Sequence, residues 1–338
     1  MTQTVPVGSA PGLTPRTKRT PGQLTLFILS RYGTLIGLAL MIVLFTVRAP
    51  SAFFSAQNFT NILAQGSLTA IIAAGLTMTL VVGEFDLSIG YTASFAGLLV
   101  VGFMALQGLP IWLAVPLMLV IGGIIGALNG VLVTKARISA VIATLGVGTI
   151  LTGLGFAYSP FPIVTNIPTE FSQISLGRLI PGVPNSIPIM VIVLALLWVV
   201  LNKTNLGIRM QAVGGNPEAA RLSGIRVDRV KIFAFATAGV CAALTGVMLS
   251  SLLGSGTLAA ADGYLLDAFA AVFLGSATLR DGEFHIVGTL VGVLVISVGF
   301  NGLSIFGAPS WAQQVFSGGI LILAVGLATL SRRYLKTS

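Results

Sequence analysis

The chain has 338 residues, of which 55% are hydrophobic and only 8% are charged, and its formal net charge is +9. Soluble globular domains carry about a quarter charged residues, so this composition excludes a water-soluble enzyme of this size and is typical of packed membrane helices. The basic residues lie between apolar runs rather than in one patch, which argues against a nucleic-acid partner.

The spacing of apolar residues predicts an all-α, polytopic membrane helix bundle of about ten transmembrane helices, with a transmembrane domain over 33–331. A spanning helix needs about 20 mainly apolar residues. The run at 264–279 is short and contains Asp267, so a re-entrant or broken helix is the alternative to a full crossing. In chain order the runs are 33–48, 60–82, 89–107, 111–134, 138–158, 187–202, 232–254, 264–279, 285–306 and 311–331.

The positions of lysine and arginine predict that both termini are cytoplasmic. If all ten runs cross, only Arg48 and Arg178 fall outside, and the other 16 basic residues fall inside. The orientation makes 159–186 a periplasmic loop and 203–231 a cytoplasmic segment. A signal peptide near the N-terminus is the weaker interpretation, because further spans follow the first run. The predicted basic cytoplasmic tails, of which the first is flexible, are 1–32 and 332–338.

Glycine recurs every fourth residue in two of the runs. Gly122, Gly126 and Gly130 share one helix face, and so do Gly288 and Gly292. Small residues at this spacing let helix backbones approach closely within lipid, where no hydrophobic force draws helices together. The pattern predicts a compact bundle and does not indicate a function.

The chain lacks the sequence motifs of an enzyme. It has no G-x-x-x-x-G-K-[ST] loop for ATP, no H-E-x-x-H and no G-x-S-x-G, so we expect no catalytic residues and no cofactor in this chain. The single Cys241 permits no internal disulfide, and the single His285 without clustered cysteines leaves no metal site. A polytopic membrane protein of this kind is expected to be a transporter or a channel.

Between the second and third runs, at 83–90, lies Gly-Glu-Phe-Asp-Leu-Ser-Ile-Gly, which places two carboxylates between long apolar stretches. A charge at bilayer depth is costly and needs a partner, water or a function. One interpretation is a tight turn in which Asp86 caps a helix that starts near Leu87. The other is a gate or substrate-path element, with a proton relay through Glu84 as a weaker variant. The candidate gate residues are Gly83, Glu84, Asp86, Ser88 and Gly90.

A second segment, within 203–231, carries a full set of helix signals. Asn216 suits the N-cap, Pro217 the first helical position and Glu218 the positive helix end, while Gly224 can stop the helix. A helix of about two turns is marginal alone in water, so we expect it to dock on a partner rather than form a plain loop. The candidate docking residues are Gly214, Asn216, Pro217, Glu218, Ala219, Ala220, Arg221, Leu222 and Gly224.

A few polar and aromatic residues inside the runs are candidates for a substrate path. Asn61, Gln65, Asn129 and Asn301 can face the bundle interior and bind a sugar hydroxyl, or can bond a neighbouring helix. The helix-to-helix bond is the commoner role for any one of them. Phe300 can stack on a sugar face, although an aromatic residue in a membrane helix usually only packs.

The chain resembles, from about residue 33 to 331, the inner-membrane permeases of bacterial ABC sugar importers that carry ribose, xylose, arabinose or galactose. Their superfamily also includes permeases for branched-chain amino acids. The gate pattern G-G-[hydrophobic]-D-L-S-[VI]-G matches except that Glu84 stands where the second glycine is usual. The cytoplasmic signature matches over Gly207–Lys231. Further matches are 138–146 and 311–314.

This resemblance implies a division of labour among several chains. Two permease subunits, identical or paired with a close relative, would form the pathway in the bacterial inner membrane. Cytoplasmic ATPase subunits would bind the ATP and grip the helix from Pro217 to Ser223 as a coupling helix. A periplasmic binding protein would deliver the sugar and would dock on the proline-rich loop 159–186. The alternatives are a permease for branched-chain amino acids or nucleosides, and a proton-coupled transporter that uses Glu84 and Asp86.

Overall fold

The computed structural model describes the backbone of residues 21–277 and 282–336 and the side chains of 32–277 and 282–326. Within these ranges the chain forms helices and no strand, which confirms the all-α membrane bundle. Six of the helices are long and apolar enough to cross a membrane, so the number of ten crossings stays a prediction. The ten long helices are α1 (Pro21–Arg48), α3 (Ala56–Val81), α4 (Ile89–Ala105), α5 (Ile111–Thr134), α6 (Ala140–Tyr158), α8 (Ser186–Lys203), α11 (Val227–Leu253), α12 (Asp262–Ser276), α13 (Ile286–Ile305) and α14 (Ser310–Lys336).

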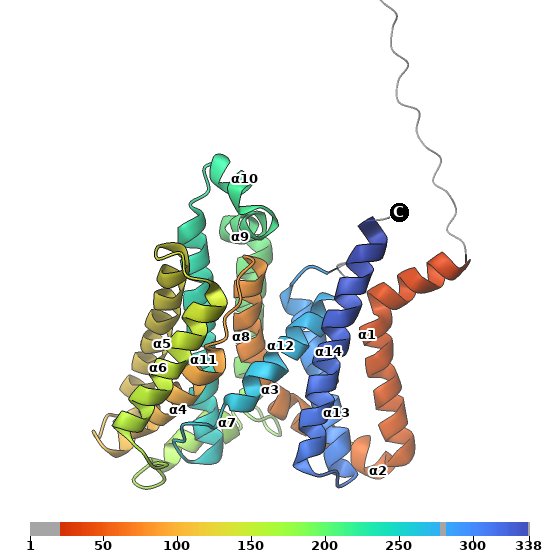
Figure 1. The fold of residues 1–338 in the computed structure, drawn as a ribbon. Helices are drawn as coiled ribbons and strands as arrows, with labels where there is room; N and C mark the ends of the chain where they lie inside the picture. The colour runs from red at the N-terminus through yellow and green to blue at the C-terminus, as the bar shows by residue number, and fades with distance from the viewer. Residues whose placement is uncertain (1–20, 278–281, 337–338) are drawn as a thin grey trace, which may run out of the picture.

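Short helices occupy the connections between the long ones. Two of them, α9 and α10, lie at one end of the bundle, which we call the α10 end, and α7 lies at the opposite end, the α7 end (Figure 1). The short elements are α2 (Pro50–Phe53), η1 (Thr169–Ser172), α7 (Gln173–Leu176), α9 (Asn205–Gly215) and α10 (Pro217–Leu222).

Helices α1 and α14 reach into both predicted tails. Helix α1 already begins at Pro21, so 21–32 is helical, and α14 continues to Lys336. The physical reason at the first end is the apolar stretch Leu-Thr-Leu-Phe-Ile-Leu at 24–29, which extends the helical run past the single Arg31. The rest of the predicted tails, 1–20 and 337–338, and the end of the run predicted at 264–279 lie outside the described residues.

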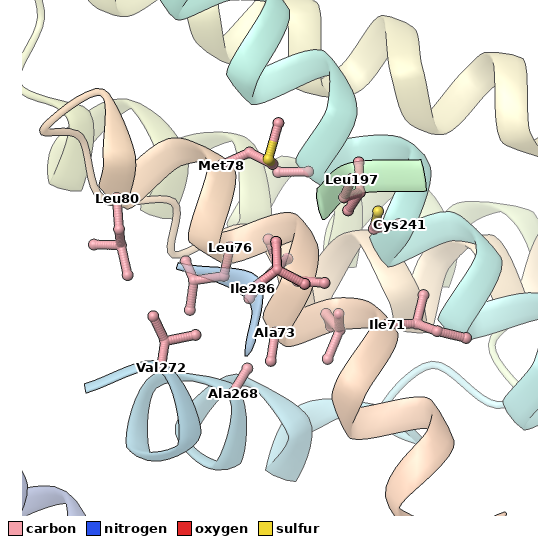
Figure 2. Close-up of a cluster of buried hydrophobic side chains, with 14 of the residues drawn as sticks. Ile71, Ala73, Leu76, Met78, Leu80, Leu197, Cys241, Ala268, Val272 and Ile286 are labelled. Carbon is pink, nitrogen blue, oxygen red and sulfur yellow. The ribbon is translucent and has the colours of Figure 1, made fainter. Parts of the chain in front are cut away.

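Helix α3 is the central helix of the bundle. Its residues 66–81 are all buried, because α8, α11, α12 and α13 pack around it. Figure 2 shows the result: Leu197 and Cys241 lie on one side of α3, and Ala268 and Val272 lie on the other. In a second group of helices, α4 and α5 pack against α11, and α6 packs against α4 and α5 (Figure 1).

The predicted glycine faces are confirmed as helix contacts. A Cβ added at Gly126 would overlap the carbonyl oxygen of Phe235 on α11, and one at Gly239 would overlap the carbonyl oxygen of Gly122 on α5. The pair Gly288 and Gly292 on α13 meets the backbone of α12 in the same way. These crossings bring main chain against main chain, so no larger side chain fits there.

The connection 159–186 is partly folded into the bundle. The Phe171 side chain is buried, and its carbonyl accepts a hydrogen bond from Ser251 Oγ at 2.7 Å. Ser175 Oγ donates to the carbonyl of Met248 on α11, also at 2.7 Å. The connection is therefore anchored to the end of α11 through Phe171 and Ser175, while much of the rest of it is exposed.

Candidate functional site

The turn that ends α3 needs one glycine. Gly83 has φ +82°, the left-handed conformation that favours glycine. The N–H of Gly83 bonds the carbonyl of Leu80 at 3.0 Å, and the N–H of Glu84 bonds the carbonyl of Thr79 at 3.0 Å. This pair of bonds is the Schellman ending of a helix. Glutamate is tolerated at position 84 because the left-handed residue is Gly83.

Beyond this turn, residues 84–88 have no regular secondary structure, and α4 begins at Ile89. The cap of α4 is Ser88, so the expectation that Asp86 caps a helix starting near Leu87 is wrong. Asp86 instead folds back on its own segment: its Oδ1 accepts from the Ser88 N–H at 2.9 Å and from Ser88 Oγ at 2.6 Å. This local turn pairs the backbone N–H of Ser88 with the Asp86 side chain, so the helix begins after Ser88 rather than near Leu87.

Asp86 belongs to a buried polar cluster at the N-terminus of α4. Only 1% of Asp86 is exposed, and Asn129 on α5 is fully buried. Asn129 Nδ2 donates to Ser88 Oγ at 2.8 Å, while Asn129 Oδ1 and Asp86 Oδ2 have no hydrogen-bond partner among the described residues. Buried acceptors are normally paired, so a proton on Asp86 or a water molecule would complete this network.

The stretch 84–88 contacts four different helices. The Leu87 N–H donates to Thr144 Oγ1 on α6 at 3.1 Å, and Phe85 stacks on Phe269 of α12 at a centroid distance of 6.2 Å. Glu84 pairs with Lys231 on α11, and Ser88 reaches α5 as described. A Cβ at Gly90 would press on the start of α12. The predicted gate residues therefore lie at a junction of helices, whereas their role in gating stays a prediction.

We expect the stability of the fold to depend on the hydrogen bonds that Asp86 Oδ1 accepts and not on a negative charge at this position. Asp86→Asn keeps the Oδ1 acceptor for both Ser88 donors, so its melting temperature in detergent should equal or exceed that of the unmodified protein. Asp86→Ala leaves the Ser88 N–H and hydroxyl without an acceptor and should cost about 1–3 kcal/mol. If Asp86→Asn is as unstable as Asp86→Ala, the fold requires the ionised carboxylate and the expectation is wrong.

At the α10 end the structure confirms the predicted capped helix. Asn216 Oδ1 accepts from the N–H groups of Glu218 at 3.1 Å and Ala219 at 3.0 Å, with Pro217 in the first turn. Gly224, with φ +80°, follows the helix in the left-handed conformation. What the sequence did not indicate is α9, a helix that precedes α10 within the segment 203–231.

Helix α10 protrudes from the bundle (Figure 1). Ala220 is buried, and it holds the helix on its neighbours α9 and α11. Leu222 is 90% exposed, and the Arg221–Glu218 pair at 3.4 Å is exposed as well. The helix therefore offers an apolar tip within a charged rim.

The backbone of α9 rests directly on the end of α3. A Cβ added at Gly214 would overlap the carbonyl oxygen of Val81, the last residue of α3, while one at the adjacent Gly215 would meet nothing within 4 Å. The start of the docking segment is thus in direct contact with the turn that leads to Glu84.

The candidate path residues do not form one site. Asn61 and Gln65 are exposed on α3, and Asn129 belongs to the Asp86 cluster near the other end of that helix. Asn301 makes a helix-to-helix bond instead, and Phe300 packs edge-on against Phe316 with centroids 6.2 Å apart. A contact of these residues with substrate stays a prediction.

In two features of the structure the sequence did not indicate which residues would be partners. Asn58 on α3 and Asn301 on α13 exchange two buried amide hydrogen bonds, at 3.0 and 2.8 Å. Phe85, Phe269 and Phe273 form a mutual stack with centroids 6.2–6.4 Å apart. Both join residues far apart in the chain, so only the packing of the helices reveals them.

Comparison with known proteins agrees with this architecture. Residues 58–325 match the family model described as "Branched-chain amino acid transport system / permease component". The chain belongs to this permease family. The permease is 37% identical over 306 residues to the ribose import permease protein RbsC of Haemophilus influenzae, covering 89% of this chain and 93% of the relative.

Other relatives of the permease are also named as sugar permeases. RbsC of Bacillus subtilis is 38% identical, over 88% of this chain and 92% of its own length. The D-allose permease AlsC of Escherichia coli is 32% identical, over 89% and 92%. These relatives confirm the resemblance to permeases of bacterial ABC sugar importers. No solved structure matches the permease.

Proposed function

We propose that this permease is the membrane-spanning subunit of an ABC importer in the bacterial inner membrane and forms the translocation pathway for a monosaccharide. The relatives named for ribose, allose and xylose, 30–38% identical over most of the chain, support the substrate class. A second permease subunit completes the pathway, and separate ATPase subunits bind the ATP that drives it.

The observation that carries this proposal is the capped and exposed helix α10. A six-residue helix is marginal alone in water, yet this one has an N-cap with two hydrogen bonds and a glycine stop. Leu222 at its tip is 90% exposed. A rigid apolar tip that the bundle does not cover suits a groove on an ATPase subunit.

The opposite end of the bundle suits the periplasmic binding protein. The connection 159–186 carries exposed apolar side chains while Phe171 anchors it to the bundle. Leu179 is 87% exposed and Phe161 is 76% exposed. An anchored surface with protruding apolar groups loses little conformational freedom when a partner docks.

We expect the ATPase subunits to leave when α10 or its tip is damaged. Asn216→Ala with Gly224→Val removes the cap, worth about 1 kcal/mol, and strains the stop, so the marginal helix should melt. Leu222→Asp keeps the helix and places a charge at its tip. Both should lower ATPase co-purification and ATP-driven uptake of labelled D-ribose, D-allose or D-xylose by about tenfold or more.

The matched control is Leu179→Asp, which changes an equally exposed leucine at the α7 end. It should leave the ATPase bound and weaken docking of the binding protein instead. All variants should keep the size-exclusion profile of the folded bundle. Intact ATPase binding in the Asn216 and Leu222 variants would show that α10 is not the coupling helix.

The same vesicles separate the remaining alternatives. Uptake of branched-chain amino acids or nucleosides, with no uptake of the three sugars, would favour the related permease classes. Uptake driven by a pH gradient without any ATPase would favour a proton-coupled transporter. Against that reading, Glu84 is already engaged by Lys231.

A further inference from the structure

The gate residues and the coupling helix share a second connection besides the contact of Gly214 with Val81. Glu84 forms an ion pair with Lys231 Nζ on α11, across 147 positions of sequence. Lys231 lies one helical turn into α11, the helix that directly follows α10. The pair therefore joins the residues just before Asp86 to the chain just after α10.

The Glu84–Lys231 pair is more shielded from solvent than the other two ion pairs of the described side chains. Its side chains are 17% and 18% exposed, whereas those of the Lys135–Asp228 pair are 63% and 34% exposed. Partly buried charges are screened little by salt, and a charge left alone there is costly. We therefore expect Glu84 and Lys231 to stay paired when α11 is displaced by a small distance.

The two connections act on opposite sides of α10. Gly214 stands ahead of α10 and presses on the end of α3, while Lys231 stands behind it and holds Glu84. Asp86 lies two residues after Glu84, and its side chain accepts the two hydrogen bonds from Ser88 that precede α4. A displacement of α10 that tilts the first turn of α11 must then pull on the stretch 84–88.

We propose that Glu84 and Lys231 are positioning residues that transmit the movement of the coupling helix to the stretch 84–88. This inference rests on the proposed function.

The test follows the stretch 84–88 in the full transporter reconstituted with its ATPase. Phe85, 41% exposed, is replaced by cysteine in a chain whose only native cysteine, Cys241, is buried. The rate of maleimide labelling is measured without nucleotide and with ATP plus vanadate. With the ion pair intact, we expect the nucleotide to change the rate by about tenfold.

Glu84→Gln or Lys231→Met should abolish that change, and the reversed pair, Glu84→Lys with Lys231→Glu, should restore it. Lys135→Met, which breaks the exposed pair on the same end of α11, should leave it unaltered. A purely structural ion pair would lower the yield of folded protein but would not remove the nucleotide effect from the folded fraction.

Three results overturn the inference. They are a nucleotide effect that survives Glu84→Gln and Lys231→Met, an equal loss in Lys135→Met, and no effect of nucleotide on Phe85→Cys in the otherwise native complex. Failure of the proposed function looks different, because the ATPase would then not co-purify with any form of the chain, including one with the ion pair intact.

Discussion

Gly126→Leu is expected to prevent the bundle from folding. The Cα of Gly126 faces the carbonyl oxygen of Phe235, so any side chain collides with the main chain of α11 rather than with a flexible group. Overpacking a core costs about 1–3 kcal/mol even where side chains can yield, and backbone yields less. The leucine therefore forces α5 and α11 apart and breaks the packing between these two helices.

The measurement is the yield of monodisperse protein and its melting temperature in mild detergent. Gly153→Leu is the matched control, because a Cβ at Gly153 on α6 meets nothing within 4 Å. The control should fold like the unmodified permease. Comparable yields and melting temperatures for the two variants would contradict the α5–α11 crossing.

Gly214→Ala is expected to abolish transport while the bundle remains folded. The added methyl group would overlap the Val81 carbonyl, so α9 must lift from the end of α3. Helices α8, α11, α12 and α13 pack around α3, so the bundle should stay folded when α9 shifts at one end of it (Figure 1). We expect ATP-driven sugar uptake to fall by about tenfold or more, which is the scale of a lost coupling between sites.

Gly215→Ala provides the adjacent control with the same substitution. A Cβ there meets open space, and alanine favours the helix slightly more than glycine does. Uptake should therefore stay near that of the unmodified permease, and both variants should show similar melting temperatures. If both substitutions lower uptake equally, the loss comes from glycine flexibility before α10 and not from the contact with Val81.

Local signals in the sequence predicted α10 well. Asn216, Pro217 and Gly224 act on backbone groups only a few positions away, so their roles follow from spacing alone. The glycine faces were also predictable, because a repeat every four residues places them on one side of any helix. The partner of each face was not predictable, since α5 meets α11 across more than a hundred positions of sequence.

The contacts of the stretch 84–88 could not be predicted from its local sequence. The sequence marked Asp86 as a carboxylate between apolar runs and offered a helix cap as one role for it, but its Oδ1 accepts from Ser88 ahead of α4. The partners Asn129 and Lys231 come from other helices, and nothing in the spacing of the sequence marks them as neighbours.

Composition and short-range spacing by themselves determined that this chain is a helical membrane bundle with one capped helix outside it, because hydropathy and capping act over a few residues. Only the tertiary structure decided that α3 is central, that Gly214 touches Val81 and that Glu84 meets Lys231. Such contacts depend on which helices lie side by side, and lipid-facing and protein-facing apolar residues look alike in a sequence.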